Sequence, residues 1–191
     1  MKVGLFFGSF NPIHTGHLII AQHFVSWCDV DQVWLIVSPQ NPFKEKASLL
    51  DEKHRLYMAN LAVEDNYQLR ASNIEFHLPR PSYTIDTLTY MEEQYPDTSF
   101  TLLMGSDTLS GIHKWKNSET LLQRYPIYVY ERPGSSPGDI KVTGNIQYTK
   151  APLLQISATF IRDAIAAGKD IRYLVPEKVY NYIDEMHFYK G

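Results

Sequence analysis

The sequence has few of the features that mark secreted, membrane or fibrous proteins. Its single cysteine, Cys28, excludes an intrachain disulfide and fits a reducing cytoplasm. No apolar run approaches the length that spans a membrane, and the N-terminus carries no basic, hydrophobic signal segment. Internal repeats and extended low-complexity tracts are also missing. We therefore expect a soluble protein located in the cytoplasm.

The charges nearly balance. The chain has 18 Lys and Arg against 21 Asp and Glu, a net charge of −3, so it lacks the basic character typical of nucleic-acid binding. We expect neither nucleic acid nor a membrane as a partner, and the oligomeric state stays open, a homo-oligomer included. A length of 191 residues suits one domain with a full core. We expect a single domain over 1–191 whose C-terminal part, from about 150, is mostly helical.

Short apolar runs alternate with amphipathic helical patterns along the chain. Runs of this kind are typical of parallel strands that are buried on both faces. They predict an α/β fold with a Rossmann-like, open and mainly parallel sheet and helices on both of its faces. Strands are expected at 2–7, 33–37, 68–72, 73–77, 100–104 and 127–130, and helices are expected to begin near 15, 48, 84, 118, 157 and 176.

The helical spacing also predicts which side chains are buried. Trp27 and Phe160 fall on the apolar faces of their helices and are expected to point inward. His54 and Arg55 lie in the polar portion of theirs, so we expect both in solvent.

The most specific stretch runs from Gly8 to His17, between the first strand and the first helix. Turns of this kind carry the ligand sites of open parallel sheets. Gly8 lets a ligand approach the main chain, and His14 and His17 share one face of the first helical turn. Two imidazoles beside free helix amides suit a phosphate chain. A plain connector is one alternative; a zinc site is another, but the other ligands it needs are missing here.

This stretch resembles the Gly-x-Phe-x-Pro-x-His-x-Gly-His signature of the nucleotidyltransferase superfamily, which transfers nucleotidyl groups from nucleoside triphosphates. In that superfamily the two histidines contact the triphosphate. Asn11 stands where many bacterial members have Asp, and the loss of a charge that would repel phosphate leaves the implied role intact. The resemblance implies that ATP binds along Gly8, Ser9, Phe10, His14 and His17.

A second stretch, Ile-Ser-Ala-Thr-Phe-Ile-Arg at 156–162, has similar chemistry. Ser157 is a good helix N-cap; a cap alone explains this serine but not the arginine one turn later. Hydroxyls, helix amides and a planar cation together make a phosphate cradle. The stretch resembles the superfamily's Ile-Ser-Ser-Thr-x-Ile-Arg motif, with Ala158 in place of the second serine. It implies ATP contacts from Ser157, Thr159 and Arg162.

The central segments point to the second substrate. Residues 82–88 are typical of a helix start, with Ser82 or Thr84 as the cap. They also resemble a stretch of the bacterial nicotinate mononucleotide adenylyltransferases, which implies that Thr84 helps to hold the nicotinate carboxylate. Trp115 lies among polar residues, which favours a ligand-stacking ring over a place in the core. The same resemblance implies that Trp115 stacks on the pyridine ring.

Further polar residues follow predicted strands. Lys44 ends a loop that contains two prolines, Pro39 and Pro42; it is either a solvated lysine or a phosphate contact, and its place after a strand and the family resemblance favour the second. Asp107, just after Gly105, either caps the next helix or accepts hydrogen bonds from ribose hydroxyls of ATP. Arg132 is either solvated or part of the ATP pocket, and the family resemblance favours the pocket.

Together the motifs imply an adenylyltransferase that joins ATP and nicotinate mononucleotide to give nicotinate adenine dinucleotide and pyrophosphate in NAD biosynthesis. A phosphate monoester has a second pKa of about 6, so its direct in-line attack on the α-phosphorus needs no general base. His14, His17, Lys44 and Arg162 are expected to position and stabilise the phosphates, with Lys44 also contacting the acceptor. Mg²⁺ is expected to bind mainly through the ATP phosphates, without protein ligands. The alternatives are a related nucleotidyltransferase with a nicotinamide mononucleotide or phosphopantetheine acceptor, and a non-catalytic nucleotide sensor.

Overall fold

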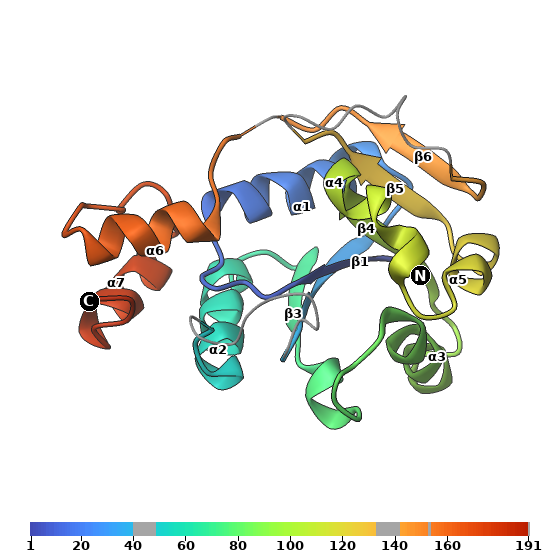
Figure 1. The fold of residues 1–191 in the computed structure, drawn as a ribbon, viewed down its shortest axis with the longest axis horizontal. Helices are drawn as coiled ribbons and strands as arrows, with labels where there is room; N and C mark the ends of the chain where they lie inside the picture. The colour runs from blue at the N-terminus through green and yellow to red at the C-terminus, as the bar shows by residue number, and fades with distance from the viewer. Residues whose placement is uncertain (40–48, 133–141, 153, 191) are drawn as a thin grey trace.

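The structure, a computed structural model, describes residues 1–39, 49–132, 142–152 and 154–190. Its described residues form a six-stranded parallel sheet in the order β3-β2-β1-β4-β5-β6, which can be followed in Figure 1. This order and the parallel pairing are those of a Rossmann-like sheet and confirm the predicted fold class. The strands are β1 (Lys2–Gly8), β2 (Gln32–Val37), β3 (Leu69–Ser72), β4 (Ser99–Gly105), β5 (Ile127–Tyr130) and β6 (Ile146–Thr149).

Successive residues of each strand point to opposite faces of the sheet, and each face has its own hydrophobic core. Phe6 and Leu35 are paired neighbours that pack with one group of helices, whereas Leu5 and Trp34, the pair before them, pack with the other. The first group is α1 (Thr15–Trp27), α2 (Glu52–Val63), α6 (Ala158–Ala166) and α7 (Glu177–Glu185). The second group is α3 (Thr84–Gln94), α4 (Ser106–Ser110) and α5 (Ser118–Arg124).

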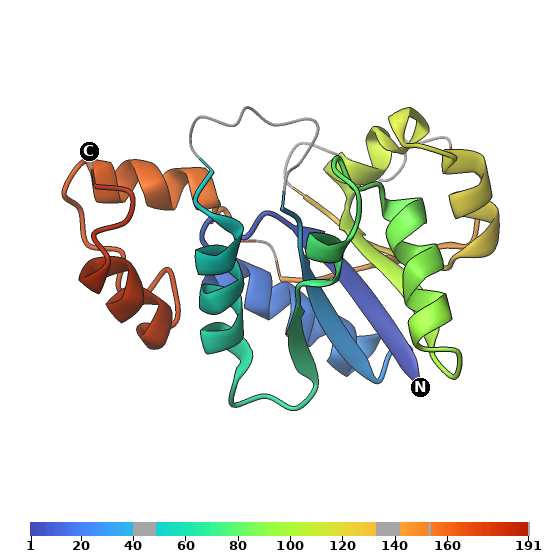
Figure 2. The ribbon, with the colours of Figure 1, turned by 90° about the horizontal axis from the view of Figure 1, so that it is seen from below.

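The C-terminal helices lie at one end of the molecule. Figures 1 and 2 both show α6 and α7 beside α2, with α3, α4 and α5 at the opposite end. Ile161 of α6 and Val179 and Ile183 of α7 belong to the same hydrophobic core as Phe24 of α1, so these helices pack against the rest of the fold. Among the described residues, no helix is long and apolar enough to cross a membrane.

Most of the expected elements are present, with three differences. The segment 73–77 was predicted to be a strand but forms the 3-10 helix η2 (Ile74–His77), because its amides bond to carbonyls three residues back. α2 begins after Asp51, whose carboxylate accepts a hydrogen bond from the Lys53 amide at 2.8 Å, and Ser48 lies outside the described residues. The edge strand β6 has no counterpart in the sequence prediction.

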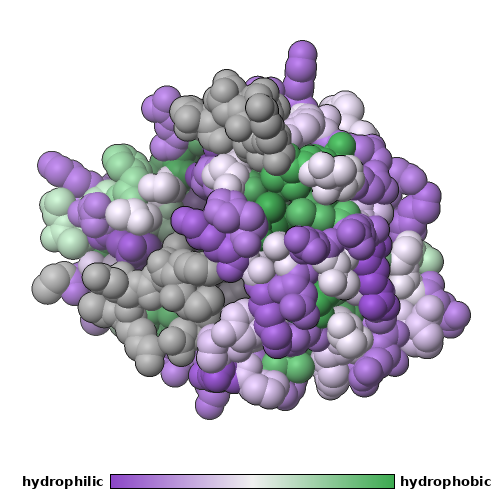
Figure 3. Space-filling model, turned by 45° about the vertical axis from the view of Figure 1, so that its right-hand side comes forward, coloured by the Kyte–Doolittle hydropathy of each residue, from purple (hydrophilic) through white to green (hydrophobic). Residues whose placement is uncertain are grey.

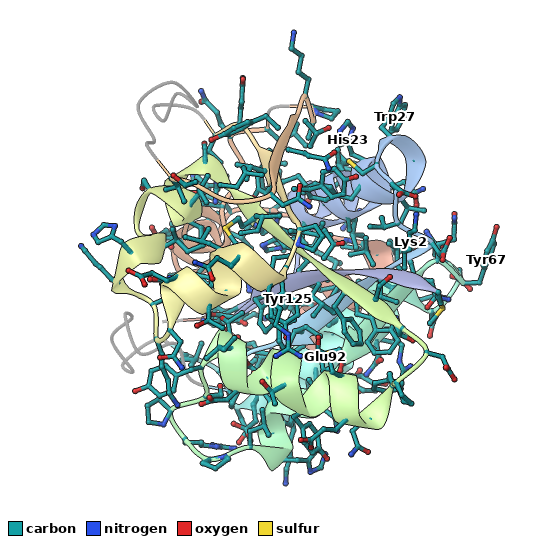
Figure 4. The ribbon with its side chains drawn as sticks, turned by 90° about the vertical axis from the view of Figure 1, so that its right-hand side faces the viewer. Lys2, His23, Trp27, Tyr67, Glu92 and Tyr125 are labelled. Carbon is teal, nitrogen blue, oxygen red and sulfur yellow. The ribbon has the colours of Figure 1, made fainter. Side chains whose placement is uncertain are left out.

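The structure overturns three burial predictions. Arg55 is fully buried instead of solvated. Trp27 is 74% exposed instead of packed in the core; it lies at the end of α1, where its ring stacks on His23 (Figure 4). Phe160 is also exposed, because the neighbouring Ile161 takes the inward position of α6. On the side drawn in Figure 3, hydrophilic residues surround a hydrophobic patch.

Candidate active site

A cleft with a volume of about 680 Å³ lies at the carboxyl ends of the central strands. This is where open parallel sheets bind their ligands. Every site residue predicted from the sequence lines it, except Lys44, which lies outside the described residues. The structure thus brings together segments that are far apart in the chain: Gly8, Ser9, Phe10, His14, His17, Thr84, Gly105, Asp107, Trp115, Arg132, Ser157, Thr159 and Arg162.

The turn after β1 closes around an aromatic ring. Phe10 is nearly fully buried and has a φ of 45°, a left-handed backbone conformation that side chains other than glycine rarely adopt. Its ring packs edge-on against Phe6 and His17, with ring centres 6.1 and 5.0 Å away. A Cβ atom on Gly8 would come within 2.8 Å of this ring, so glycine makes the fold of the turn feasible. The Phe10 ring therefore packs against the His17 ring and restricts its orientation.

The two histidines form a stacked pair at the start of α1. His14 is the N-cap residue and His17 the third residue of the helix, and their ring centres are 3.7 Å apart. The backbone amide of His14 donates a hydrogen bond to Nδ1 of His17 at 3.3 Å. With Nδ1 as an acceptor, neutral His17 carries its proton on Nε2, where it can serve as a donor to a ligand.

His14 is held in its neutral form. It is 5% exposed, and burial, helped by the positive charge of Arg132, lowers its pKa to about 4. Its Nδ1 atom and the hydroxyl of Ser9 are buried polar atoms with no hydrogen-bond partner among the described residues. Both residues line the cleft. Unpaired buried polar atoms are costly, and a polar ligand in the cleft would satisfy them.

α6 brings a cation to the same turn. Ser157 caps this helix, as predicted, by accepting a hydrogen bond from the Phe160 amide at 3.1 Å. One turn later, Arg162 donates to the carbonyl oxygen of Asn11 at 2.8 Å and to the hydroxyl of Thr159 at 3.3 Å. The two stretches that resemble phosphate-binding motifs are therefore joined directly, although 151 positions separate Asn11 from Arg162.

An ion pair forms another wall of the cleft. Arg132 and Asp107 approach to 3.4 Å, and both side chains are partly exposed. Gly105 makes room for them, because a Cβ atom there would come within 2.8 Å of the Arg132 side chain. The capping alternative for Asp107 is wrong: the N-cap of α4 is Gly105, and Asp107 lies inside the first turn. Its carboxylate is thus available to the cleft at the end of β4.

The start of α3 lies across the cleft. The predicted cap at Ser82 or Thr84 is wrong: the N-cap is Tyr83, and it makes no side-chain cap hydrogen bond. Thr84 is the first helical residue of α3, and it lines the cleft. Trp115 follows the 3-10 helix η3 (Ile112–Lys114); it is half-buried, with one part packed on the core and another part lining the cleft.

Two buried charged residues were missed at the sequence level. Arg55 donates hydrogen bonds to four carbonyl oxygens, those of Ser9, Ser38, Pro39 and Leu50, at 2.6 to 3.0 Å. It thereby ties the turn after β1 to the segment after β2. The available signal was its spacing, because Arg55 lies three and four residues before the buried Met58 and Ala59 of α2.

Glu75 is the second missed residue. It lines the cleft, is 3% exposed, and accepts a hydrogen bond from the Thr87 hydroxyl of α3 at 2.9 Å. Burial raises the pKa of its carboxyl group, although hydrogen bonds from Thr87, Ser38 and Ser82 oppose the rise. Among the described residues, no three His, Cys, Asp or Glu side chains gather closely enough to hold a metal ion.

Comparison with known proteins agrees with this geometry. The model of the cytidylyltransferase-like family matches residues 5–164. A Christiangramia forsetii protein named probable nicotinate-nucleotide adenylyltransferase is 52% identical over 191 residues, covering 99% of this chain and 98% of that protein. A protein of the same name from Flavobacterium johnsoniae is 48% identical over the whole of both chains.

A solved structure shows that the fold is shared more widely. The Plasmodium falciparum nicotinic acid mononucleotide adenylyltransferase, solved in complex with NaAD, superposes with a TM-score of 0.82 at 19% identity, covering 98% of this chain and 97% of that one. The fold, the gathered motifs and the full-length likeness lead to one conclusion: the chain belongs to the nicotinate-nucleotide adenylyltransferases of the cytidylyltransferase-like family.

Proposed function

We propose that this protein transfers the adenylyl group of ATP to nicotinate mononucleotide, giving nicotinate adenine dinucleotide and pyrophosphate. The observation that carries the proposal is the joining of the two helix starts: Arg162 of α6 bonds to the turn that presents His14 and His17. The cleft between them offers cationic and N–H donors to a polyphosphate. The unpaired Nδ1 of His14 and hydroxyl of Ser9 supply further polar contacts.

In the proposed reaction the phosphate oxygen of nicotinate mononucleotide attacks the α-phosphorus of ATP in line. The new P–O bond forms as the bond to the bridging oxygen breaks, and that electron pair leaves with pyrophosphate. The protein moves no proton, because the attacking phosphate is already mostly dianionic near neutral pH. Nε2–H of His17 and the guanidinium of Arg162 would stabilise the charge that develops on the leaving oxygens. Lys44 has the same proposed role.

The two ends of the substrates need separate recognition. Asp107, at the carboxyl end of β4, is placed to accept hydrogen bonds from the ribose hydroxyls of ATP, beside Arg132. On the other side, Thr84 at the start of α3 offers donors for the nicotinate carboxylate. The ring of Trp115 offers a flat apolar face for the pyridine. With these roles we expect the acid to react faster than its amide.

Mg²⁺ is proposed to enter with ATP, held by the triphosphate and water, as this ion usually is. When bound it would neutralise part of the phosphate charge. The carboxylate of Asp107, which we assign to the ribose, is paired with Arg132. This ion pair fits a metal ion that is held by the phosphates and not by Asp107. We also propose a cytoplasmic location, because the reaction consumes ATP and the single Cys28 leaves the fold independent of an intrachain disulfide.

The proposal is tested by pyrophosphate release with ATP and Mg²⁺, comparing nicotinate mononucleotide with its amide. We expect release with the acid and much slower release with the amide. Equal rates would keep the reaction class and refute the roles of Thr84 and Trp115. No release with either, despite measurable ATP binding, would refute the proposed activity in favour of a different acceptor or a sensor.

His17→Ala tests the phosphate site itself. Losing one preorganised donor should lower kcat by about 100-fold, as removal of a single oxyanion donor does elsewhere. His77→Ala, at an exposed position of η2, is the matched control and should behave as wild type. Near wild-type turnover in a folded His17→Ala protein would exclude His17 from the proposed role.

A further inference from the structure

The end of the chain reaches the turn after β1. The hydroxyl of Tyr189 donates a hydrogen bond to Oδ1 of Asn11 at 2.8 Å, across 178 positions of sequence. The Tyr189 ring is half-buried and packs against the hydrophobic core that α1, α2, α6 and α7 share. Tyr189 does not line the cleft, whereas Asn11 does. The hydrogen bond to Asn11 therefore links Tyr189 directly to a residue of the cleft.

Asn11 connects three separate segments to this turn. It is 5% exposed, and its side-chain oxygen accepts hydrogen bonds from the Leu50 amide at 3.3 Å and from Tyr189. Its backbone oxygen accepts the hydrogen bond from Arg162. The residue that orients Arg162 is thus itself held in place by the last residues of the chain. A shift of Asn11 would move the acceptor that fixes this guanidinium in the cleft.

The backbone at the C-terminus is bent to make this contact. His187 and Tyr189 have φ values of 54° and 61°, in the left-handed region that residues other than glycine avoid. The bend is held by the amide of Phe188, which donates to the carbonyl oxygen of Ile183, and by Lys190, which bonds to Asp184. Here a disfavoured conformation is kept, and it points the phenol at Asn11.

The phenol is held in its donor form. Burial raises the pKa of Tyr189, against the opposing effect of the nearby charges of Arg55 and Arg162. A protonated hydroxyl donates to the amide oxygen of Asn11, and the positive charges around it do not change that state at neutral pH. The phenol therefore stays protonated at neutral pH and can donate this hydrogen bond.

We propose that Tyr189 is a positioning residue for the adenylyl transfer: it fixes Asn11 and, through it, the guanidinium of Arg162. The proposal rests on the proposed function, since it assigns Arg162 to the phosphates. It extends the functional site to Tyr189, a residue outside the lining of the cleft.

Tyr189→Phe removes the hydroxyl and keeps the ring. We expect kcat/KM for ATP and the affinity for ATP to fall about fivefold, the effect of one hydrogen bond. Tyr182→Phe is the matched control, because its hydroxyl bonds to Nδ1 of His54 at 2.8 Å, away from the turn. Both variants lose one phenol hydroxyl in the C-terminal segment, so their melting temperatures should fall similarly. The kinetic loss should appear with Tyr189→Phe alone.

A double-mutant cycle with Arg162→Ala distinguishes a positioning effect on Arg162 from a general loss of stability. If Tyr189 acts through Arg162, Tyr189→Phe should have almost no further effect on ATP affinity once Arg162 is gone. Additive losses, or the same kinetic loss in Tyr182→Phe, would overturn the proposal. ATP affinity is measured by direct calorimetric titration, so this test does not depend on turnover. If the wild-type protein binds ATP but transfers nothing, the proposed function is refuted. The double-mutant cycle still decides whether Tyr189 acts on ATP binding through Arg162.

Discussion

Arg55 is expected to be among the most important residues for stability, although it touches no substrate. Its guanidinium is fully buried and donates to the carbonyl oxygens of Ser9, Ser38, Pro39 and Leu50. Hydrogen bonds from a charged donor contribute about 1.5–3 kcal/mol each, partly offset by the cost of burying the charge. Arg55→Met keeps the length of the side chain but leaves these oxygens without their donor. We expect a loss of about 3–5 kcal/mol in the free energy of unfolding.

For a chain of this size, that loss lowers the melting temperature by about 10 °C. Urea titration followed by circular dichroism measures the free energy directly. The control is Arg70→Met: Arg70 is exposed on β3, with its guanidinium 4.6 Å from the centre of the Trp34 ring, so the loss should stay below about 1 kcal/mol. Arg55→Lys, which keeps the charge but not the planar fork, should fall between them. Equal losses in Arg55→Met and Arg70→Met would refute the reasoning.

Two further predictions concern pH and the acceptor site. Because the pKa of His14 is lowered from 6.5 to about 4, the unfolded chain binds a proton in this range that the folded chain does not. The free energy of unfolding should therefore fall as the pH drops from 6.5 to 4, by up to about 3 kcal/mol from this group. Urea titrations at several pH values should show a smaller fall in His14→Gln. An equal fall in the wild type and the variant would contradict the assignment. Trp115→Ala should raise the KM for nicotinate mononucleotide about tenfold through lost stacking and leave the KM for ATP nearly unchanged. Initial rates with each substrate varied in turn measure this, and a rise confined to ATP would move Trp115 to the nucleotide half of the cleft.

The parts of the site at the starts of α1 and α6 could be predicted from the sequence, because they depend on local patterns. His14 and Ser157 occupy N-cap positions, and an apolar strand precedes the first of them. Arg55 was missed because arginine is usually solvated, so its polarity predicts exposure. Its spacing from Met58 and Ala59 shows that position in the pattern was the better guide.

Other features left no local signal. Among the described residues β6 pairs only with β5, and its Gln147 and Tyr148 are exposed, so no apolar run marks this edge strand. The contact between Tyr189 and Asn11 joins residues 178 positions apart, and hydrogen bonds at such separation follow from the packing of whole elements. A sequence pattern reports on neighbours along a helix or strand, so it cannot report on such contacts.

The division between local and distant contacts explains how the cleft works. Local capping sets the direction in which each helix start points its donors: the His14 amide fixes Nδ1 of His17, and Ser157 fixes the first turn of α6. It does not set the distance between the two helix starts. That distance depends on bonds between segments, from Arg162 to Asn11 and from Asn11 to the C-terminus. Since a polyphosphate must meet both helix starts at once, substitutions in the connecting bonds should change the alignment of the site even where every phosphate contact is intact.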